Sequence, residues 1–215
     1  MPRAEFVIIG LQKTKSHTRK DATLLMEDLL DSILNSMSSV KKPQKKAMVI
    51  ILTPLAYFQG RANFRNLSRF CSLCEETLGR WSLRSFSYQE FNRILLQRTQ
   101  NLDSDWIASI DASFLPKSGK ATEGLGYFYS GSQSKVQKGL EMSLLSVTDM
   151  KANTGFGLLA KQTLDQEFSD AMAGNRIDQA VDQIQDCKTE LDMLGIQNIV
   201  ADAWYSKERF IVSAH

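Results

Sequence analysis

The sequence predicts a protein of mixed α and β structure, in which a helical N-terminal domain precedes a mixed β-sheet with the element order β-β-β-α-β. Before residue 100, apolar residues recur at the spacing of amphipathic helices. From Trp106 onward, short runs of β-forming residues bounded by glycine prevail, with one strongly periodic helix among them. A chain of 215 residues is long enough for one large or two small domains.

A change of charge along the chain supports this division. Residues 1–100 hold 16 Lys and Arg against 8 Asp and Glu, a net charge of +8, whereas residues 101–215 hold 10 against 16, a net of −6. Such a sequence is typical of a polyanion-binding module joined to one whose acids hold cations, although two ordinary solvated surfaces give the same totals. We predict a helical domain over residues 20–101 and a sheet domain over 105–215, and assign no role to residues 1–19.

Cysteine content and hydropathy limit the protein class. The pair Cys71 and Cys74 has no second CxxC and no His pair at zinc-finger spacing, so we interpret all three cysteines as structural thiols of a reducing compartment. The longest apolar run, residues 47–58, contains Pro54 and is shorter than the ~20 residues that a membrane span needs. We therefore expect a soluble intracellular protein.

Two long helices are expected at the start of the helical domain. Asp21 is a candidate N-cap, and the second helix should begin near Pro43, a residue suited to a first helical turn. Pro54 should kink or break this second helix before Gly60. The apolar stripe of the first helix comprises Leu24, Leu25, Leu29, Ile33, Leu34 and Met37.

Residues 61–81 have the spacing of a helix-turn-helix unit. Two short helices, 64–70 and 75–81, flank a tight turn in which Ser72 would cap the second helix, and another helix follows over residues 88–97. A three-helix packing unit with a solvated basic face is the alternative. If the unit binds DNA, the residues expected to contact it here and in the preceding helix are Lys45, Lys46, Arg61, Arg65, Arg69, Arg80 and Arg84.

Two acids follow apolar, β-forming residues in the sheet domain. Asp111 lies within the strand-like run that starts at Trp106, and Asp202 ends the run over residues 196–202. A buried carboxylate must be hydrogen-bonded, paired or bound to a cation, and local capping of a loop is the alternative. Because ligands gather outside the carboxyl ends of strands, the two acids are candidate metal ligands. Lys117 and Lys120 are expected beside this metal site, where they would contact DNA phosphates unless they are ordinary turn lysines.

The remaining elements complete the predicted topology. Residues 126–130 and 140–147 are expected as antiparallel strands, and residues 149–175 as an irregular segment. Residues 177–194 have the clearest helical period, with Gly195 at the position of a C-cap, and a short helix opens near residue 206. The order β-β-β-α-β is that of the front half of a ribonuclease-H-like fold, in which the first and fourth strands are neighbours.

Several segments together resemble a known family. The segments are Ile110-Asp-Ala-Ser-Phe-Leu-Pro-Lys-Ser-Gly-Lys, residues 124–131, residues 135–139 and Val200-Ala-Asp-Ala-Trp-Tyr. They resemble DDE transposases of bacterial insertion sequences, in the insertion sequence four grouping, and residues 60–69 with Phe91 and Asn92 resemble the helical DNA-binding region of these enzymes. The resemblance implies DNA transposition, in which a metal-activated water cleaves a strand and the freed 3′-hydroxyl attacks target DNA.

The resemblance also implies roles for individual residues. Asp111 matches the first catalytic and metal-binding acid and Asp202 the second, with Mg²⁺ or Mn²⁺ as cofactor. The third acid, a downstream Glu, has no counterpart before His215, because Glu208 lies too close to Asp202. The ribonuclease-H-like domain is thus expected to be incomplete, with exposed apolar surface unless a second chain or full-length transposase completes it. The expected partner is double-stranded DNA, at element ends and target, in the bacterial cytoplasm and nucleoid, with no membrane.

Three functions remain open at this stage. The first is DNA cleavage and strand transfer by a transposase, here in truncated form. The second is a DNA-binding remnant that regulates transposition without catalysis, which predicts salt-sensitive DNA binding and no metal-dependent cleavage. The third is a host ribonuclease-H-like nuclease. A downstream reading frame with the missing Glu, flanked by inverted repeats, would support the first and argue against the third.

Overall fold

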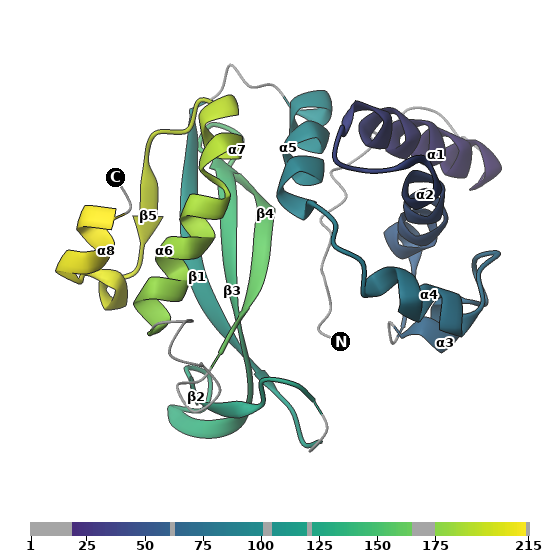
Figure 1. The fold of residues 1–215 in the computed structure, drawn as a ribbon. Coiled ribbons are helices and arrows are strands. Elements are labelled where there is room, and N and C mark those ends of the chain that lie inside the picture. Colours follow the sequence, from purple (N-terminus) through teal and green to yellow (C-terminus); the bar gives the residue numbers. More distant parts are fainter. Residues whose placement is uncertain (1–18, 61–62, 101–104, 120–121, 165–174, 214–215) are drawn as a thin grey trace. The chain divides into compact units, whose positions relative to one another are not determined.

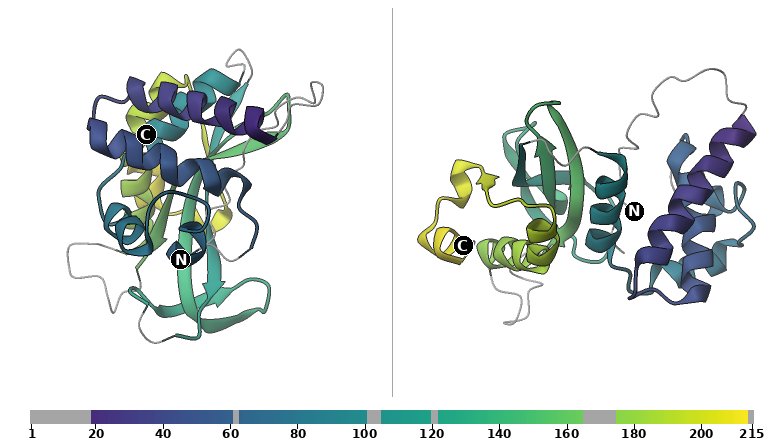
Figure 2. Two further views of the ribbon diagram at one scale, coloured as in Figure 1. Left: turned by 90° about the vertical axis from the view of Figure 1, so that its right-hand side faces the viewer. Right: turned by 90° about the horizontal axis from the view of Figure 1, so that it is seen from above.

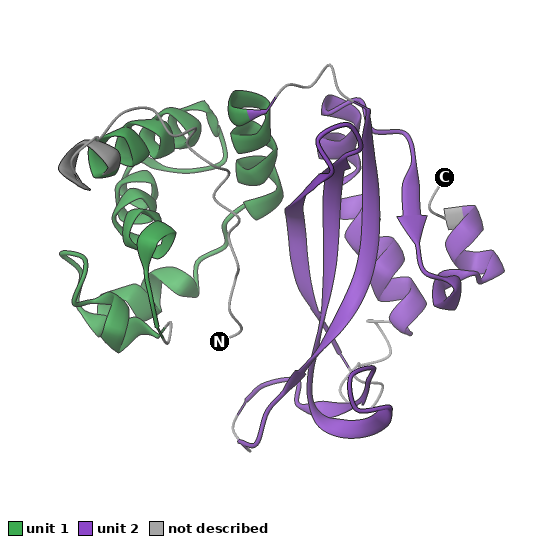
Figure 3. Cartoon of the chain, turned by 180° about the vertical axis from the view of Figure 1, so that it is seen from behind, with its two compact units in different colours: residues 1–99 green, residues 100–215 purple. Residues whose placement is uncertain are grey.

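A computed structural model of the chain describes residues 19–60, 63–100, 105–119, 122–164 and 175–213. The chain forms two compact units, residues 1–99 and 100–215 (Figure 3). Helices build the first unit, and a mixed five-stranded sheet with helices builds the second (Figure 1). The predicted class, a helical part followed by a mixed sheet, is confirmed at this level. In the described part of the chain, none of the helices combines the length and the apolar character needed to cross a membrane.

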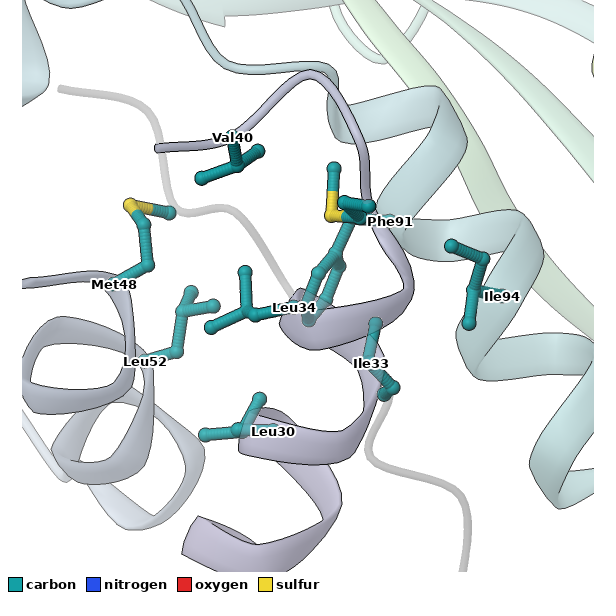
Figure 4. Packing of buried hydrophobic residues seen from close by; sticks show 9 residues of the cluster. Leu30, Ile33, Leu34, Val40, Met48, Leu52, Phe91 and Ile94 are labelled. Carbon is teal, nitrogen blue, oxygen red and sulfur yellow. The ribbon is translucent and has the colours of Figure 1, made fainter. Parts of the chain in front are cut away.

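The core of unit 1 is formed by its longer helices. Leu34 on the first helix packs with Leu52 on the second and Phe91 on the last (Figure 4). Leu24 and Leu25 are 58% and 48% exposed, so the predicted apolar stripe is wrong at its start. The helices of the unit are α1 (Arg19–Ser36), α2 (Lys42–Tyr57), α3 (Phe64–Leu67), α4 (Glu75–Ser82) and α5 (Tyr88–Thr99).

Helices α1 and α2 differ from the prediction at their ends. Helix α1 begins at Arg19, so Asp21 lies inside the helix and is not its N-cap. Pro43 lies in the first turn of α2 as predicted, but the helix passes through Pro54 and ends at Tyr57. The predicted break at Pro54 is wrong because this residue is buried close to the helix end, where few further backbone hydrogen bonds are at stake.

Helices α3 and α4 are in contact, and α3 is shorter than predicted. It has four residues and is capped by Asn63, whose Oδ1 accepts a hydrogen bond from the Asn66 N–H at 2.8 Å. Helix α4 begins after Cys74, so the prediction of Ser72 as its N-cap is wrong. A Cβ atom at Gly79 would lie 3.8 Å from Cδ2 of Phe64, which shows that the Phe64 ring covers α4 at van der Waals distance.

The sheet of unit 2 is centred on its longest strand. Strand β3 pairs antiparallel with β1, β2 and β4, whereas β1 pairs parallel with β5 (Figure 1). The predicted parallel pairing of the Asp111 strand with the strand before Asp202 is therefore confirmed. The strands are β1 (Trp106–Pro116), β2 (Gly126–Ser130), β3 (Lys135–Asp149), β4 (Thr154–Thr163) and β5 (Ile199–Ala201).

Strand β4 lies in the segment that was predicted to be irregular, and the predicted count of three strands before the helix is wrong by one. Phe156 and Leu158 are buried, whereas Gly155 and Gly157 between and beside them are exposed. Because glycine has a low strand propensity, the alternation of buried and exposed residues in this segment did not indicate a strand. Pairing along β3 from Glu141 to Asp149 and burial of the two apolar side chains outweigh this local preference.

Helices α6 (Arg176–Asp186) and α7 (Lys188–Met193) lie on one face of the sheet (Figure 2). They replace the single helix predicted over residues 177–194, because the backbone departs from helical geometry at Cys187. Gln183 is fully buried and donates hydrogen bonds to the main-chain oxygens of Ser143 and Leu159, which ties α6 to β3 and β4. The chain then passes through β5 to a short 3₁₀ turn (Ala203–Tyr205) and α8 (Glu208–Ser213).

Candidate functional site

Asp111 and Asp202 occupy neighbouring positions on parallel strands. In the register of β1 and β5, Ile110 pairs with Ala201, so Asp111 is the next residue of β1 and Asp202 is the residue that follows β5. The backbone of Asp202 is still extended, with φ −67° and ψ 162°. Since paired strands lie ~4.8 Å apart, the two carboxylates start from adjacent points beside the carboxyl end of β5.

The face of the sheet on which Asp111 lies explains how the strand tolerates an acid. Ala108 and Ile110 are buried, and the side chains alternate along β1, so Asp111 points to the opposite face and is exposed. The expectation that this carboxylate would be buried, and would therefore need a partner, is wrong. One oxygen of Asp111 accepts a hydrogen bond from the Ala112 N–H at 2.8 Å.

Asp202 is exposed as well and caps the 3₁₀ turn that follows it. Its Oδ1 accepts a hydrogen bond from the Trp204 N–H, which is the local capping that the sequence left open as an alternative. Among the described residues, neither Asp111 nor Asp202 forms an ion pair with Lys or Arg. Each acid thus has one oxygen held by the backbone and a charge that no described cation neutralises.

The pKa of the Tyr205 hydroxyl is affected by the charges of both acids. Tyr205 is buried and packs against the rings of Trp204 and Phe210, with centroid distances of 5.0 and 5.2 Å. Burial is the main cause that raises its pKa to about 12, and the charges of Asp111, Glu141 and Asp202 raise it further while Arg176 lowers it. The carboxylates of β1 and of the residue after β5 therefore act on the same hydroxyl.

We expect the stability of the chain to fall at high pH through Tyr205. The unfolded chain loses this proton near pH 10.0, whereas the folded chain keeps it to about pH 12, so unfolding releases a proton in this window. The free energy of unfolding should then fall by up to about 1.4 kcal/mol for each pH unit. Denaturant unfolding from pH 9 to 12 should show a shallower decline for Tyr205→Phe than for the wild type; equal slopes would contradict the shift.

The two carboxylates are a suitable pair of ligands for a divalent cation. The described residues contain no group of three or more His, Cys, Asp and Glu side chains that could hold a metal. Proteins nevertheless commonly bind Mg²⁺ through one or two carboxylates, with water and substrate phosphates completing the octahedron. Asp111 and Asp202 match that donor set, because both are exposed, adjacent along paired strands and supply only oxygen.

The basic residues predicted to contact DNA lie in unit 1, apart from two lysines. Lys46 and the four described arginines are exposed, whereas the ammonium of Lys45 lies 3.5 Å from the Asn35 carbonyl oxygen. The guanidinium of Arg84 stacks over Trp81 at 4.4 Å from the ring centroid. Arg61 and Lys120 lie outside the described residues. The placed arginines are Arg65 on α3, Arg69 after α3, Arg80 on α4 and Arg84 after α4.

Lys117 is not beside Asp111, contrary to the prediction. It follows the end of β1 at Pro116, six residues beyond Asp111. At about 3.3 Å per residue this is about 20 Å along the strand. The sequence suggested proximity because it did not show that β1 continues as a strand past the acid.

Sequence reasoning also missed an ion pair and a pocket close to the two acids. Arg176 at the start of α6 pairs with Glu141 on β3 at 3.1 Å, and Glu141 is 9% exposed. A pocket of about 450 Å³ lies next to this pair. The alternation in Tyr127-Phe-Tyr could have indicated an exposed aromatic face, but the pairing of residues from β3 and α6 depends on the tertiary fold. The pocket is lined by Tyr127, Tyr129, Val136, Asn175, Arg176, Ile177 and Trp204.

No known protein-family model matches this chain, and no curated protein matches it.

Proposed function

We propose that this chain acts in DNA transposition as a DDE-type transposase polypeptide. In this proposal, unit 1 binds DNA, and Asp111 and Asp202 hold a divalent cation at the phosphate to be cleaved. The observation that carries the proposal is the parallel pairing of β1 with β5, which sets the two acids at adjacent positions. Their order and sequence context are those of the transposase motifs that the sequence resembles.

The order of the strands supports a ribonuclease-H-like assignment for unit 2. The strands β4, β3, β1 and β5 follow one another across the sheet, with α6 and α7 between β4 and β5 in sequence. Three antiparallel strands followed by a helix and a parallel strand are what this fold requires. Strand β4 takes the place that the sequence prediction gave to residues 140–147, and β2 is an additional strand paired only with the first part of β3.

The cation would neutralise charge that develops on the phosphate oxygens during strand cleavage. Two backbone N–H groups of the chain orient the carboxylates that would hold this cation. The Ala112 N–H fixes the orientation of Asp111, and the Trp204 N–H fixes that of Asp202. These hydrogen bonds leave the other oxygen of each carboxylate to face a ligand at the end of β5.

Within unit 1, we propose that the α3–α4 pair contacts the DNA backbone rather than base edges. A recognition helix reads bases with its N-terminal residues, but the first turn of α4 carries Glu75 and Glu76. These acids would repel phosphates at that end. Arg80 and Arg84 lie at the other end of α4, where they suit phosphate contacts.

Binding of Mn²⁺ tests the metal site directly. Isothermal titration of the chain with Mn²⁺ should detect binding that weakens at least about tenfold in Asp111→Asn and in Asp202→Asn, since each change removes one charged ligand. Asp192→Asn, an exposed acid on α7, is the matched control and should leave the affinity unchanged. Equal Mn²⁺ affinity in the wild type and both site variants would refute the proposed metal site.

Salt dependence of DNA binding tests the role of unit 1. The double change Arg65→Ala and Arg69→Ala should weaken duplex binding for all sequences and reduce the slope of log K against log salt by about 2. Both arginines are exposed, so the fold should persist. Fluorescence anisotropy at several salt concentrations measures the slope. Lys188→Ala on α7 is the control, and an unchanged slope in the arginine variant would rule out these phosphate contacts.

A further inference from the structure

An exposed aromatic surface surrounds the pocket near the two acids. Tyr127, Tyr129 and Trp204 are 65%, 57% and 47% exposed, and all three line the pocket together with Arg176. The volume of about 450 Å³ falls within the range of ~300–1,000 Å³ that is usual for small-ligand sites. Exposed aromatic rings gathered in this way favour a flat ligand that stacks on them. We call these three rings and Arg176 the aromatic pocket.

The side of β2 opposite the tyrosines is packed against the core. Tyr127 and Tyr129 are alternate residues of β2 and point to the same face, while Phe128 between them is 1% exposed. The guanidinium of Arg176 lies over the Phe128 ring at 5.0 Å and pairs with Glu141 at 3.1 Å. The two tyrosine rings are thus presented on a strand whose opposite side is held in the core.

A lysine next to the tyrosines can contact a phosphate group of the ligand. Lys138 pairs in register with Tyr127 and therefore lies on the same face of the sheet as the two tyrosines. Its side chain is exposed. Aromatic rings beside a cation are a combination with which proteins bind single-stranded nucleic acid, the bases stacking on the rings and the cation contacting a phosphate.

We propose that the aromatic pocket binds unpaired nucleotides of DNA, with bases stacked on Tyr127, Tyr129 and Trp204. The choice of DNA rests on the proposed function, because Trp204 is only two residues from Asp202. A DNA strand whose bases stack on these rings would pass close to the two carboxylates where it emerges from the pocket. The aromatic pocket therefore holds single-stranded DNA next to the site at which a strand would be cut.

Binding of a fluorescent oligothymidine to the full chain, in EDTA, tests this inference without catalysis. The double change Tyr127→Ala and Tyr129→Ala and the single change Trp204→Ala should each weaken binding by about tenfold or more, as loss of base stacking does. Tyr127→Phe with Tyr129→Phe keeps the rings and should bind like the wild type. Met150→Ala removes a side chain that is 60% exposed in the turn after β3 and is the surface control.

Tryptophan fluorescence distinguishes base stacking from electrostatic attraction of the oligonucleotide. Oligothymidine should quench the fluorescence of Trp204, and the quenching should be lost in Trp204→Phe although Trp81 and Trp106 remain. No detectable binding, or equal affinity for the wild type and both alanine variants with unchanged thermal unfolding, would overturn the inference. Ring-dependent binding with no loss of Mn²⁺ affinity in Asp111→Asn would instead refute the proposed function and leave the single-strand site standing.

Discussion

Replacing Asp111 with asparagine is expected to reduce Mg²⁺-dependent nicking of element-end DNA roughly a thousandfold, since a catalytic cation contributes several kcal/mol to transition-state stabilisation. The change is conservative in shape. The amide oxygen of asparagine still accepts the hydrogen bond from the Ala112 N–H, and the position is exposed, so folding should be unaffected. Asp202→Asn should reduce nicking to the same extent, because it also removes one charged ligand of the cation. Its folding should be unaffected, because the amide oxygen can still cap the turn at Trp204.

The nicking measurement uses the chain together with a polypeptide that supplies the third acid of the resembled family. Labelled duplex carrying the element end is followed on a denaturing gel, with duplex binding measured in parallel. Asp192→Asn should nick like the wild type. Full nicking by Asp111→Asn or by Asp202→Asn would exclude the catalytic assignment, whereas salt-sensitive binding without nicking by any variant would support a non-catalytic regulator.

The sequence indicated the strands of the sheet where the local pattern and the tertiary environment agree. Residues 126–130 were predicted and are β2, and the run after Trp106 is β1. Strand β4 was missed because Gly155 and Gly157 replace side chains on one face. Its strand conformation depends on pairing with β3, which a local pattern does not contain. The break at Cys187 was missed because the apolar period continues through it.

The candidate site was only partly accessible to the same reasoning. A lone acid within one strand-like run and another at the end of a second gave Asp111 and Asp202, and the parallel register brings them together. The argument from burial was wrong because it ignored which face of β1 carries the acid. Tyr205 and the Glu141–Arg176 pair could not be predicted, since they are assembled from β3, α6 and the turn after β5.

Gly139→Ala is expected to lower the free energy of unfolding by at least about 3 kcal/mol, which is the largest stability change that we expect of a single added methyl group. A Cβ atom at Gly139 would lie 2.4 Å from the Leu115 carbonyl oxygen and 2.5 Å from the Phe114 ring. Gly139 pairs with Pro116 of β1 on one side and with Gly126 of β2 on the other, so neither strand can move away without losing its pairing.

The matched control is Gly155→Ala on β4. A Cβ atom there would lie 3.5 Å from the Thr148 hydroxyl oxygen, an ordinary contact, so a change of less than about 1 kcal/mol is expected. Denaturant unfolding of both variants measures the difference.

Gly139 lies on β3 between β1 and β2, so its substitution should also displace Tyr127 and Tyr129 and weaken binding of single-stranded DNA. The acids, which lie on β1 and after β5, should keep their Mn²⁺ affinity in any Gly139→Ala chain that remains folded; equal stability of the two glycine variants would show that β1 and β2 do not meet at Gly139.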